Sequence, residues 1–215
     1  MTAKEFIDSL KLIGQEYPNS IPKRELFALA KKFENMQVLE IIKLLKYENY
    51  DYRLGAVSIL DWKARNKKTS LNDRKDIYLA YINNHDRIDD WGMVDRAAPY
   101  VVGAYLYGKD KKVLYELAKS ENPMERRTAI VSTYYFIRKN EIDDTFNIAE
   151  ILRNDKNEYV QKAVGSWIRE AGKRNENKLK LFLNTYAATL PRVTLRYAIE
   201  KLDHEVRKNY LNQGK

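Results

Sequence analysis

A motif centred on a small residue recurs along this chain and restricts the folds that the chain can adopt. The central residues are Ala56, Ala97, Ala129, Ala163 and Ala198, which are 41, 32, 34 and 35 residues apart. An apolar helical pattern follows each alanine, and a polar loop with a shorter helical pattern precedes it. A period of this length is typical of stacked helix pairs, in which alanine allows close packing against the next repeat. Chance alignment of a common residue is the alternative.

The spacing of apolar residues indicates helices throughout. Phe6, Leu10 and Ile13 lie three and four residues apart, and the same spacing recurs along the chain. Only 8 glycines and 5 prolines interrupt it, and no stretch alternates long enough to predict a strand. Short polar segments, such as 48–51, 121–123 and 154–157, separate the predicted helices. We therefore predict an all-α chain with helices of roughly 10–18 residues.

No long linker divides the sequence, so we expect one domain over residues 1–215. We expect atypical N-terminal helices over about 1–47, repeats over about 48–202 and a C-terminal cap over 203–215. Stacked helix pairs leave a concave surface lined by the second helix of each pair. The residues two positions before the alanines would share that surface: Leu54, Asp95, Arg127, Gln161 and Arg196. Together with Lys162 and Arg169, this surface would suit a phosphate backbone.

The net charge of the chain is also consistent with binding to a phosphate backbone. There are 39 Lys and Arg against 30 Asp and Glu, a net charge of +9 with a pI near 9.4. A surplus of this size favours polyanions, although a basic surface that is merely solvated would have the same composition. Because there is no cysteine and the only histidines are His85 and His204, we expect no metal site. We also expect a soluble, cytoplasmic monomer, since no signal or membrane segment is evident.

The most unusual segment runs from Asp89 to Pro99, with the sequence DDWGMVDRAAP. Trp91 and Asp95 are four residues apart in it, so they share one face of a helix. Taken alone, this pair is also compatible with a core tryptophan beside an aspartate at a helix end.

Three further segments, 125–131 (ERRTAIV), 160–170 (VQKAVGSWIRE) and 195–201 (LRYAIEK), follow this one in order. Together with the WxxVD pattern of Trp91 and Asp95, they resemble the AlkD-type DNA alkylation repair family over about residues 77–202. The resemblance implies a right-handed superhelical solenoid of HEAT-like helix pairs with a basic concave face that binds duplex DNA. It also implies hydrolysis of the N-glycosidic bond of N3- and N7-alkylated purines, without a cofactor and without flipping the base into a pocket.

Residue roles follow from the same resemblance. Trp91 matches the tryptophan that contacts the lesion-bearing nucleotide, Asp95 the catalytic aspartate, and Arg127 the arginine that supports DNA binding near the lesion. The remaining DNA-binding candidates are Arg126, Lys162, Trp167, Arg169 and Arg196, of which Lys162, Arg169 and Arg196 are expected along the groove with Arg127.

The implied chemistry suits these residue types. An alkylated N3 or N7 purine is already cationic, so the leaving group needs no general acid. A carboxylate such as that of Asp95 can stabilise the positive charge that develops on the sugar and can position water. An aromatic face such as that of Trp91 attracts cationic character, worth roughly 0.5–2 kcal/mol.

The sequence departs from the family at two places. Where the family has a second tryptophan directly after the glycine of QKAxG, this chain has Ser166, followed by Trp167, and one residue is a rotation of about 100° on a helix. The segment 17–22 stands in place of a longer N-terminal approach to DNA. Two alternatives therefore stay open: a non-catalytic paralogue that binds distorted or branched DNA, and a helical scaffold for protein partners.

Overall fold

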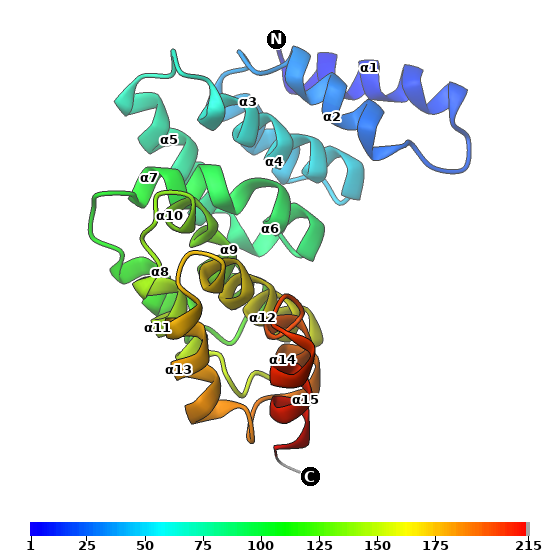
Figure 1. Ribbon diagram of the computed structural model, residues 1–215. Coiled ribbons are helices and arrows are strands. Elements are labelled where there is room, and N and C mark those ends of the chain that lie inside the picture. Colours follow the sequence, from blue (N-terminus) through cyan, green and yellow to red (C-terminus); the bar gives the residue numbers. More distant parts are fainter. Residues whose placement is uncertain (214–215) are drawn as a thin grey trace. The chain divides into compact units, whose positions relative to one another are not determined.

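The computed structural model describes residues 1–213, and every regular element in that range is a helix (Figure 1). The predicted all-α class is therefore confirmed for the described residues. The last two residues of the predicted C-terminal cap, 203–215, lie outside them. The chain forms two compact units, one from Met1 to Tyr105 and a second that begins at Leu106.

The first unit contains the N-terminal helices and the first two alanine motifs. Its elements are α1 (Ala3–Glu16), α2 (Lys23–Lys32), α3 (Val38–Leu45), α4 (Tyr50–Arg65), α5 (Leu71–Ile82), the 3₁₀ turn η1 (His85–Arg87), α6 (Trp91–Ala98) and the π-helical turn η2 (Pro99–Gly103). The short α7 (Ala104–Leu106) follows directly.

The second unit contains the other three alanine motifs. Its elements are α8 (Lys112–Leu117), α9 (Pro123–Ser132), α10 (Tyr134–Ile137), α11 (Asp143–Ile151), α12 (Glu158–Gly172), α13 (Glu176–Tyr186), α14 (Arg192–Ala198) and α15 (His204–Asn212).

The polar segments between helices act as N-terminal caps. The side chain of Asn49 accepts a hydrogen bond from a backbone N–H at the start of α4, and Asn122 and Asn157 do the same for α9 and α12. Pro123 follows Asn122 at the first helical position, where a missing N–H costs nothing. These caps satisfy N–H groups that have no partner within the helix, so the helices begin where the sequence predicts a break.

All five motif alanines are buried, with at most 2% of any of them exposed. They lie on α4, α6, α9, α12 and α14, each of which follows another helix in the chain. Within the first unit α4 packs on α6, and within the second α12 packs on both α9 and α14. In Figure 1, α9, α12 and α14 lie side by side. The small residue therefore marks helix-to-helix contacts in both units, as the repeat predicts.

The contact between α12 and α14 is close enough to require glycine. A Cβ on Gly165 would lie 2.5 Å from the carbonyl oxygen of Thr194 and 2.6 Å from Cβ of Tyr197. The hydroxyl of Thr194 donates to the carbonyl of Gln161 at 3.1 Å across the same contact. Replacing Gly165 would push α14 away from α12, since the nearest obstacle is backbone.

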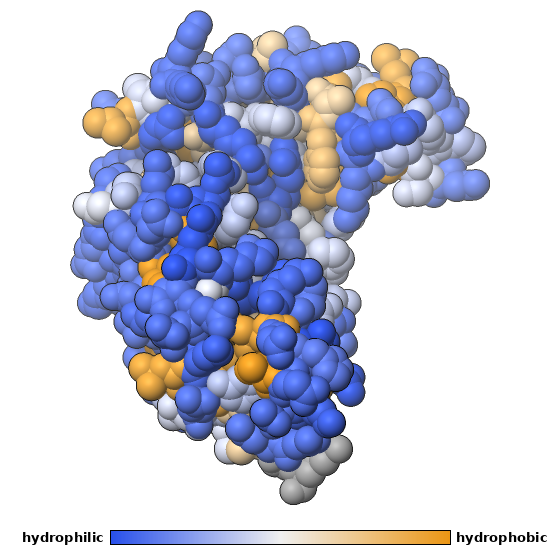
Figure 2. Space-filling model, viewed as in Figure 1, coloured by the Kyte–Doolittle hydropathy of each residue, from blue (hydrophilic) through white to orange (hydrophobic). Residues whose placement is uncertain are grey.

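The face of the molecule in Figure 2 is mostly hydrophilic, and its hydrophobic residues form small separate patches. None of the helices within residues 1–213 is both long and apolar enough to cross a bilayer.

Candidate functional site

Helix α6 presents Trp91 and Asp95 to solvent. Trp91 is 40% exposed and Asp95 is exposed, whereas the opposite face of the helix is fully buried through Met93, Val94 and Ala97. The two side chains therefore share an exposed helix face, as their spacing predicts, and Trp91 is not a core tryptophan.

Regular α-helical geometry ends directly after this pair. Residue 99 is a proline and has no N–H to donate to the carbonyl of Asp95 four residues earlier. The helix continues as the π-turn η2, Pro99–Gly103, a geometry that often occurs at functional sites. Asp95 thus lies where the backbone leaves the α-helical hydrogen-bond pattern.

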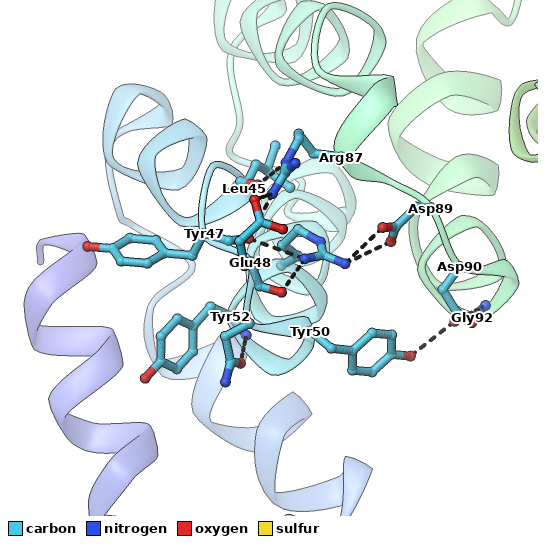
Figure 3. Close-up of polar contacts among 11 residues, drawn as sticks. Leu45, Tyr47, Glu48, Tyr50, Tyr52, Arg87, Asp89, Asp90 and Gly92 are labelled. Carbon is cyan, nitrogen blue, oxygen red and sulfur yellow. Dashed lines mark hydrogen bonds and ion pairs between the residues drawn. The ribbon is translucent and has the colours of Figure 1, made fainter.

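Two arginines fix the loop that leads into α6 (Figure 3). The buried guanidinium of Arg53 on α4 donates to both carboxylate oxygens of Asp89, at 2.9 and 3.0 Å, and to the carbonyls of Tyr47 and Glu48. Arg87 donates to the same Tyr47 carbonyl at 3.2 Å and to the Glu48 carboxylate at 2.8 Å. The bidentate ion pair between Arg53 and Asp89 fixes the orientation of the two groups as well as their distance. The start of α6 is therefore tied to the turn between α3 and α4.

Tyr50 adds a contact at the first turn of α6. Its hydroxyl donates to Oδ1 of Asp90 at 3.0 Å, and the same oxygen accepts the N–H of Gly92 at 2.8 Å (Figure 3). Burial, followed by the hydrogen bond to Asp90, raises the pKa of Tyr50 to about 12, so the phenol stays a donor at neutral pH. The ammonium of Lys23 on α2 lies 5.6 Å from the ring centroid of Trp91. Neither Lys23 nor Tyr50 could be identified from a local pattern, because both reach the site through tertiary packing.

A buried ion pair holds α6 along its length. Nη1 of Arg96 lies 3.0 Å from Oδ2 of the fully buried Asp61, which also accepts from Nε of Arg65 at 2.8 Å. The Arg96 guanidinium stacks on the rings of Phe27 and Trp62, 4.6 and 5.0 Å from their centroids. Burial raises the pKa of Asp61, while Arg96 and Arg65 oppose the shift. Arg96 follows Asp95 directly, so this contact fixes the backbone beside the exposed carboxylate.

In the second unit, Arg127 lies against α12 with only 7% of its surface exposed. Its Nη1 donates to the backbone carbonyl of Tyr159 in the first turn of α12. The predicted phosphate-binding arginine is therefore largely enclosed by its own unit.

Two of the other predicted DNA-binding arginines are engaged within the protein. Arg126 donates to both oxygens of Asp155, at 2.6 and 3.1 Å, and to two carbonyls of the preceding loop at 2.8 Å each. Arg169 contacts the carboxylates of Glu170 and Glu200. Both guanidiniums are mostly buried, at 18% exposed, so their charge is balanced inside the unit before any ligand binds.

Lys162 and Arg196 are less constrained by contacts within the protein than Arg126 and Arg169. Lys162 pairs with Glu158, one turn earlier, at 2.6 Å on the surface, and lies 5.8 Å over the ring of Tyr159. Arg196 is exposed on α14. Surface ion pairs contribute little, so Lys162 can exchange its carboxylate for a phosphate at small cost.

The row of residues two positions before the alanines is not uniformly exposed. Leu54 is buried at 1%, and Arg127 is mostly enclosed, whereas Asp95 and Arg196 face solvent. The prediction that these residues share one exposed surface is therefore wrong at Leu54, because α4 is enclosed on nearly all sides by α2, α3 and α6.

Trp167 packs within the second unit. Its ring lies 4.9 Å from that of Tyr134, tilted by 36°, and its side chain is half-buried. Ser166, at the position where the family has tryptophan, is also half-buried. Among the described residues no group of histidine, cysteine or carboxylate side chains is placed to hold a metal ion.

One comparison with known proteins bears on this geometry. The family model described as DNA alkylation repair enzyme matches residues 19–202, which is most of the chain and includes every predicted site residue. No curated protein matches the chain.

Proposed function

The chain belongs to the DNA alkylation repair enzyme family, and from this premise we propose that it is a DNA glycosylase for N3- and N7-alkylated purines in duplex DNA. The observation that supports this proposal best is the exposed pair of Trp91 and Asp95 on a helix that is fixed at its start and along its length. A catalytic carboxylate needs such support, because a small displacement of the reacting groups costs much of the rate.

The proposed reaction uses few groups. As the bond between C1′ and the purine nitrogen breaks, its electron pair neutralises the cationic base. The carboxylate of Asp95 stabilises the positive charge on the sugar, and water adds to C1′ while losing its proton toward the carboxylate. The products are a neutral alkylated purine and an abasic deoxyribose. The ring of Trp91 contacts the cationic nucleotide, as it already contacts the ammonium of Lys23.

Each unit supplies proposed DNA contacts of its own. In the second unit, Lys162 and Arg196 are the proposed phosphate contacts that are most accessible. Arg127, whose guanidinium lies beside Tyr159, is a third proposed phosphate contact but is more enclosed. Lys23 adds a cation beside Trp91. The right-handed solenoid of HEAT-like helix pairs with a basic concave face is part of the same proposal, as is a cytoplasmic monomer that needs no metal or organic cofactor.

Release of free base tests the proposal. We expect the wild type to release N7-methylguanine from a duplex that contains it, and Asp95→Asn to lower the single-turnover rate by about 10²–10⁴-fold. Asp76→Asn, an exposed aspartate on α5, is the matched control and should retain the rate. Equal rates for wild type and Asp95→Asn would refute the role of Asp95.

A second candidate function is non-catalytic binding of distorted or branched DNA. Ser166 and the packing of Trp167 on Tyr134 favour it, since both remove an aromatic contact that the family resemblance implies. Salt-sensitive binding of duplex without release of any alkylated base would support this function over the glycosylase. Absence of DNA binding at low salt would contradict both and favour a scaffold for protein partners.

A further inference from the structure

Two half-exposed tyrosines lie near Lys162 on α12 and α14, and the exposed Arg196 precedes one of them in the chain. Tyr159 is 45% exposed and Tyr197 is 38% exposed, which places both among the most exposed large side chains of the second unit. Lys162 lies 5.8 Å over the Tyr159 ring, and the pKa of its ammonium is raised by the hydrogen bond to Glu158 and, to a lesser degree, by the neighbouring Tyr197 and Tyr159. Arg196 is exposed next to Tyr197 in the chain. We call Tyr159, Lys162, Arg196 and Tyr197 the α12–α14 patch.

The position of Tyr197 follows from the close contact between the two helices. Its Cβ lies where a side chain on Gly165 would clash, so the ring emerges directly at the seam between α12 and α14. The hydrogen bond from Thr194 to Gln161 fixes the same seam about one helical turn earlier. Tyrosine has only two side-chain torsions to restrict when a ligand stacks on its ring, so the entropic cost of binding is small.

The chemistry of the patch fits a nucleotide. An exposed phenol ring offers a flat face for a base, and every base has such a face, so the contact tolerates any sequence. Lys162 and Arg196 can bind the phosphate of the same nucleotide. Since the ion pair of Lys162 with Glu158 is exposed at the surface, replacing this carboxylate by a phosphate costs little free energy.

We propose that the α12–α14 patch is a subsite for an unstacked nucleotide, with Tyr197 as the stacking ring and Lys162 and Arg196 as the phosphate contacts. Bases inside an intact duplex are stacked on each other, so only a distorted or gapped site offers a free face. The patch therefore selects distorted duplex over intact duplex. This inference rests on the proposed function in taking DNA as the ligand, and it applies equally to the glycosylase and to the non-catalytic binder.

Fluorescence anisotropy with two labelled duplexes, one fully paired and one with a single-nucleotide bulge, tests the subsite. We expect the wild type to bind the bulged duplex about 10-fold more tightly. Tyr197→Leu should remove that preference and leave the slope of log affinity against log salt unchanged, since no charge is lost. Tyr197→Phe should retain the preference, because it keeps the ring.

Matched controls separate the subsite from general effects. Tyr107 is 37% exposed in the same unit but outside α12 and α14, and Tyr107→Leu should retain the preference. Tyr159→Leu, at the surface of α12, should weaken the preference and provides a second variant that does not touch the helix seam. Thermal unfolding of each variant checks that it is folded.

Three results with the variants would overturn the subsite: an unchanged preference in Tyr197→Leu, an equal loss in Tyr197→Phe, which would assign the effect to the hydroxyl, or an equal loss in Tyr107→Leu. Failure of the wild type to bind either duplex would instead refute the proposed function. A wild type that binds both duplexes equally would refute the subsite alone.

Discussion

Gly165→Ala is a sharp test of the contact between α12 and α14. The new Cβ would lie 2.5 Å from the Thr194 carbonyl oxygen and 2.6 Å from the Tyr197 Cβ, so the backbone of α14 has to move. Overpacking of this kind costs typically 1–3 kcal/mol, and an obstacle made of backbone favours the upper end. Alanine is favoured over glycine within a helix by about 1 kcal/mol, which offsets part of the cost. The net expectation is a loss of about 1–2 kcal/mol in the free energy of unfolding.

Gly14→Ala is the matched control for this change. A Cβ on Gly14, also helical, would meet only Cδ1 of Ile21 at 3.7 Å, an ordinary contact. The same substitution should therefore be neutral or stabilise the protein by up to about 1 kcal/mol. The two variants differ in the space around the new methyl group and share the change in helix propensity.

Urea unfolding followed by far-UV circular dichroism measures both free energies. Anisotropy with a DNA duplex adds a functional readout, because a displaced α14 would also move Arg196 and Tyr197, and Gly165→Ala should weaken binding while Gly14→Ala should not. The reasoning is refuted if Gly165→Ala is as stable as the wild type, or if Gly14→Ala loses as much as Gly165→Ala.

Three further predictions concern polar and charged side chains. Tyr50→Phe removes the hydrogen bond to the Asp90 carboxylate and should cost about 1–2 kcal/mol of unfolding free energy at pH 7, measured with urea. The pKa of Tyr50 is about 12 when folded against 10.0 for the free phenol, so from pH 10 to 12 the unfolded chain releases this proton first and stability falls. The advantage of wild type over Tyr50→Phe should therefore shrink in that window, and a constant difference would contradict the shift. Arg126→Ala leaves the enclosed carboxylate of Asp155 unpaired and should cost about 3 kcal/mol with little change in the salt slope of DNA binding. Arg196→Ala should do the opposite, lowering the slope by about 1 at unchanged stability, and identical slopes for the two variants would refute the distinction.

Local patterns of the sequence predicted the helical elements of this protein well. Helix periodicity depends on residues three and four apart, and a cap depends on one side chain next to a helix start, so neither needs tertiary information. The asparagines at 49, 122 and 157 do cap helices, and the five motif alanines are all buried. The helix face shared by Trp91 and Asp95 also follows from their spacing, whereas the exposure of that face is a result of the tertiary structure.

Tertiary structure decided which charged side chains have freedom to bind a ligand. Arg126 and Arg196 are both arginines within three residues of a motif alanine, yet Arg126 meets Asp155, 29 residues away, while Arg196 faces solvent. Lys23 reaches Trp91 from a helix far earlier in the chain. Whether a guanidinium is paired with a carboxylate or can bind a ligand depends on which loop packs against it. That packing is a long-range property with no periodic signal in the sequence.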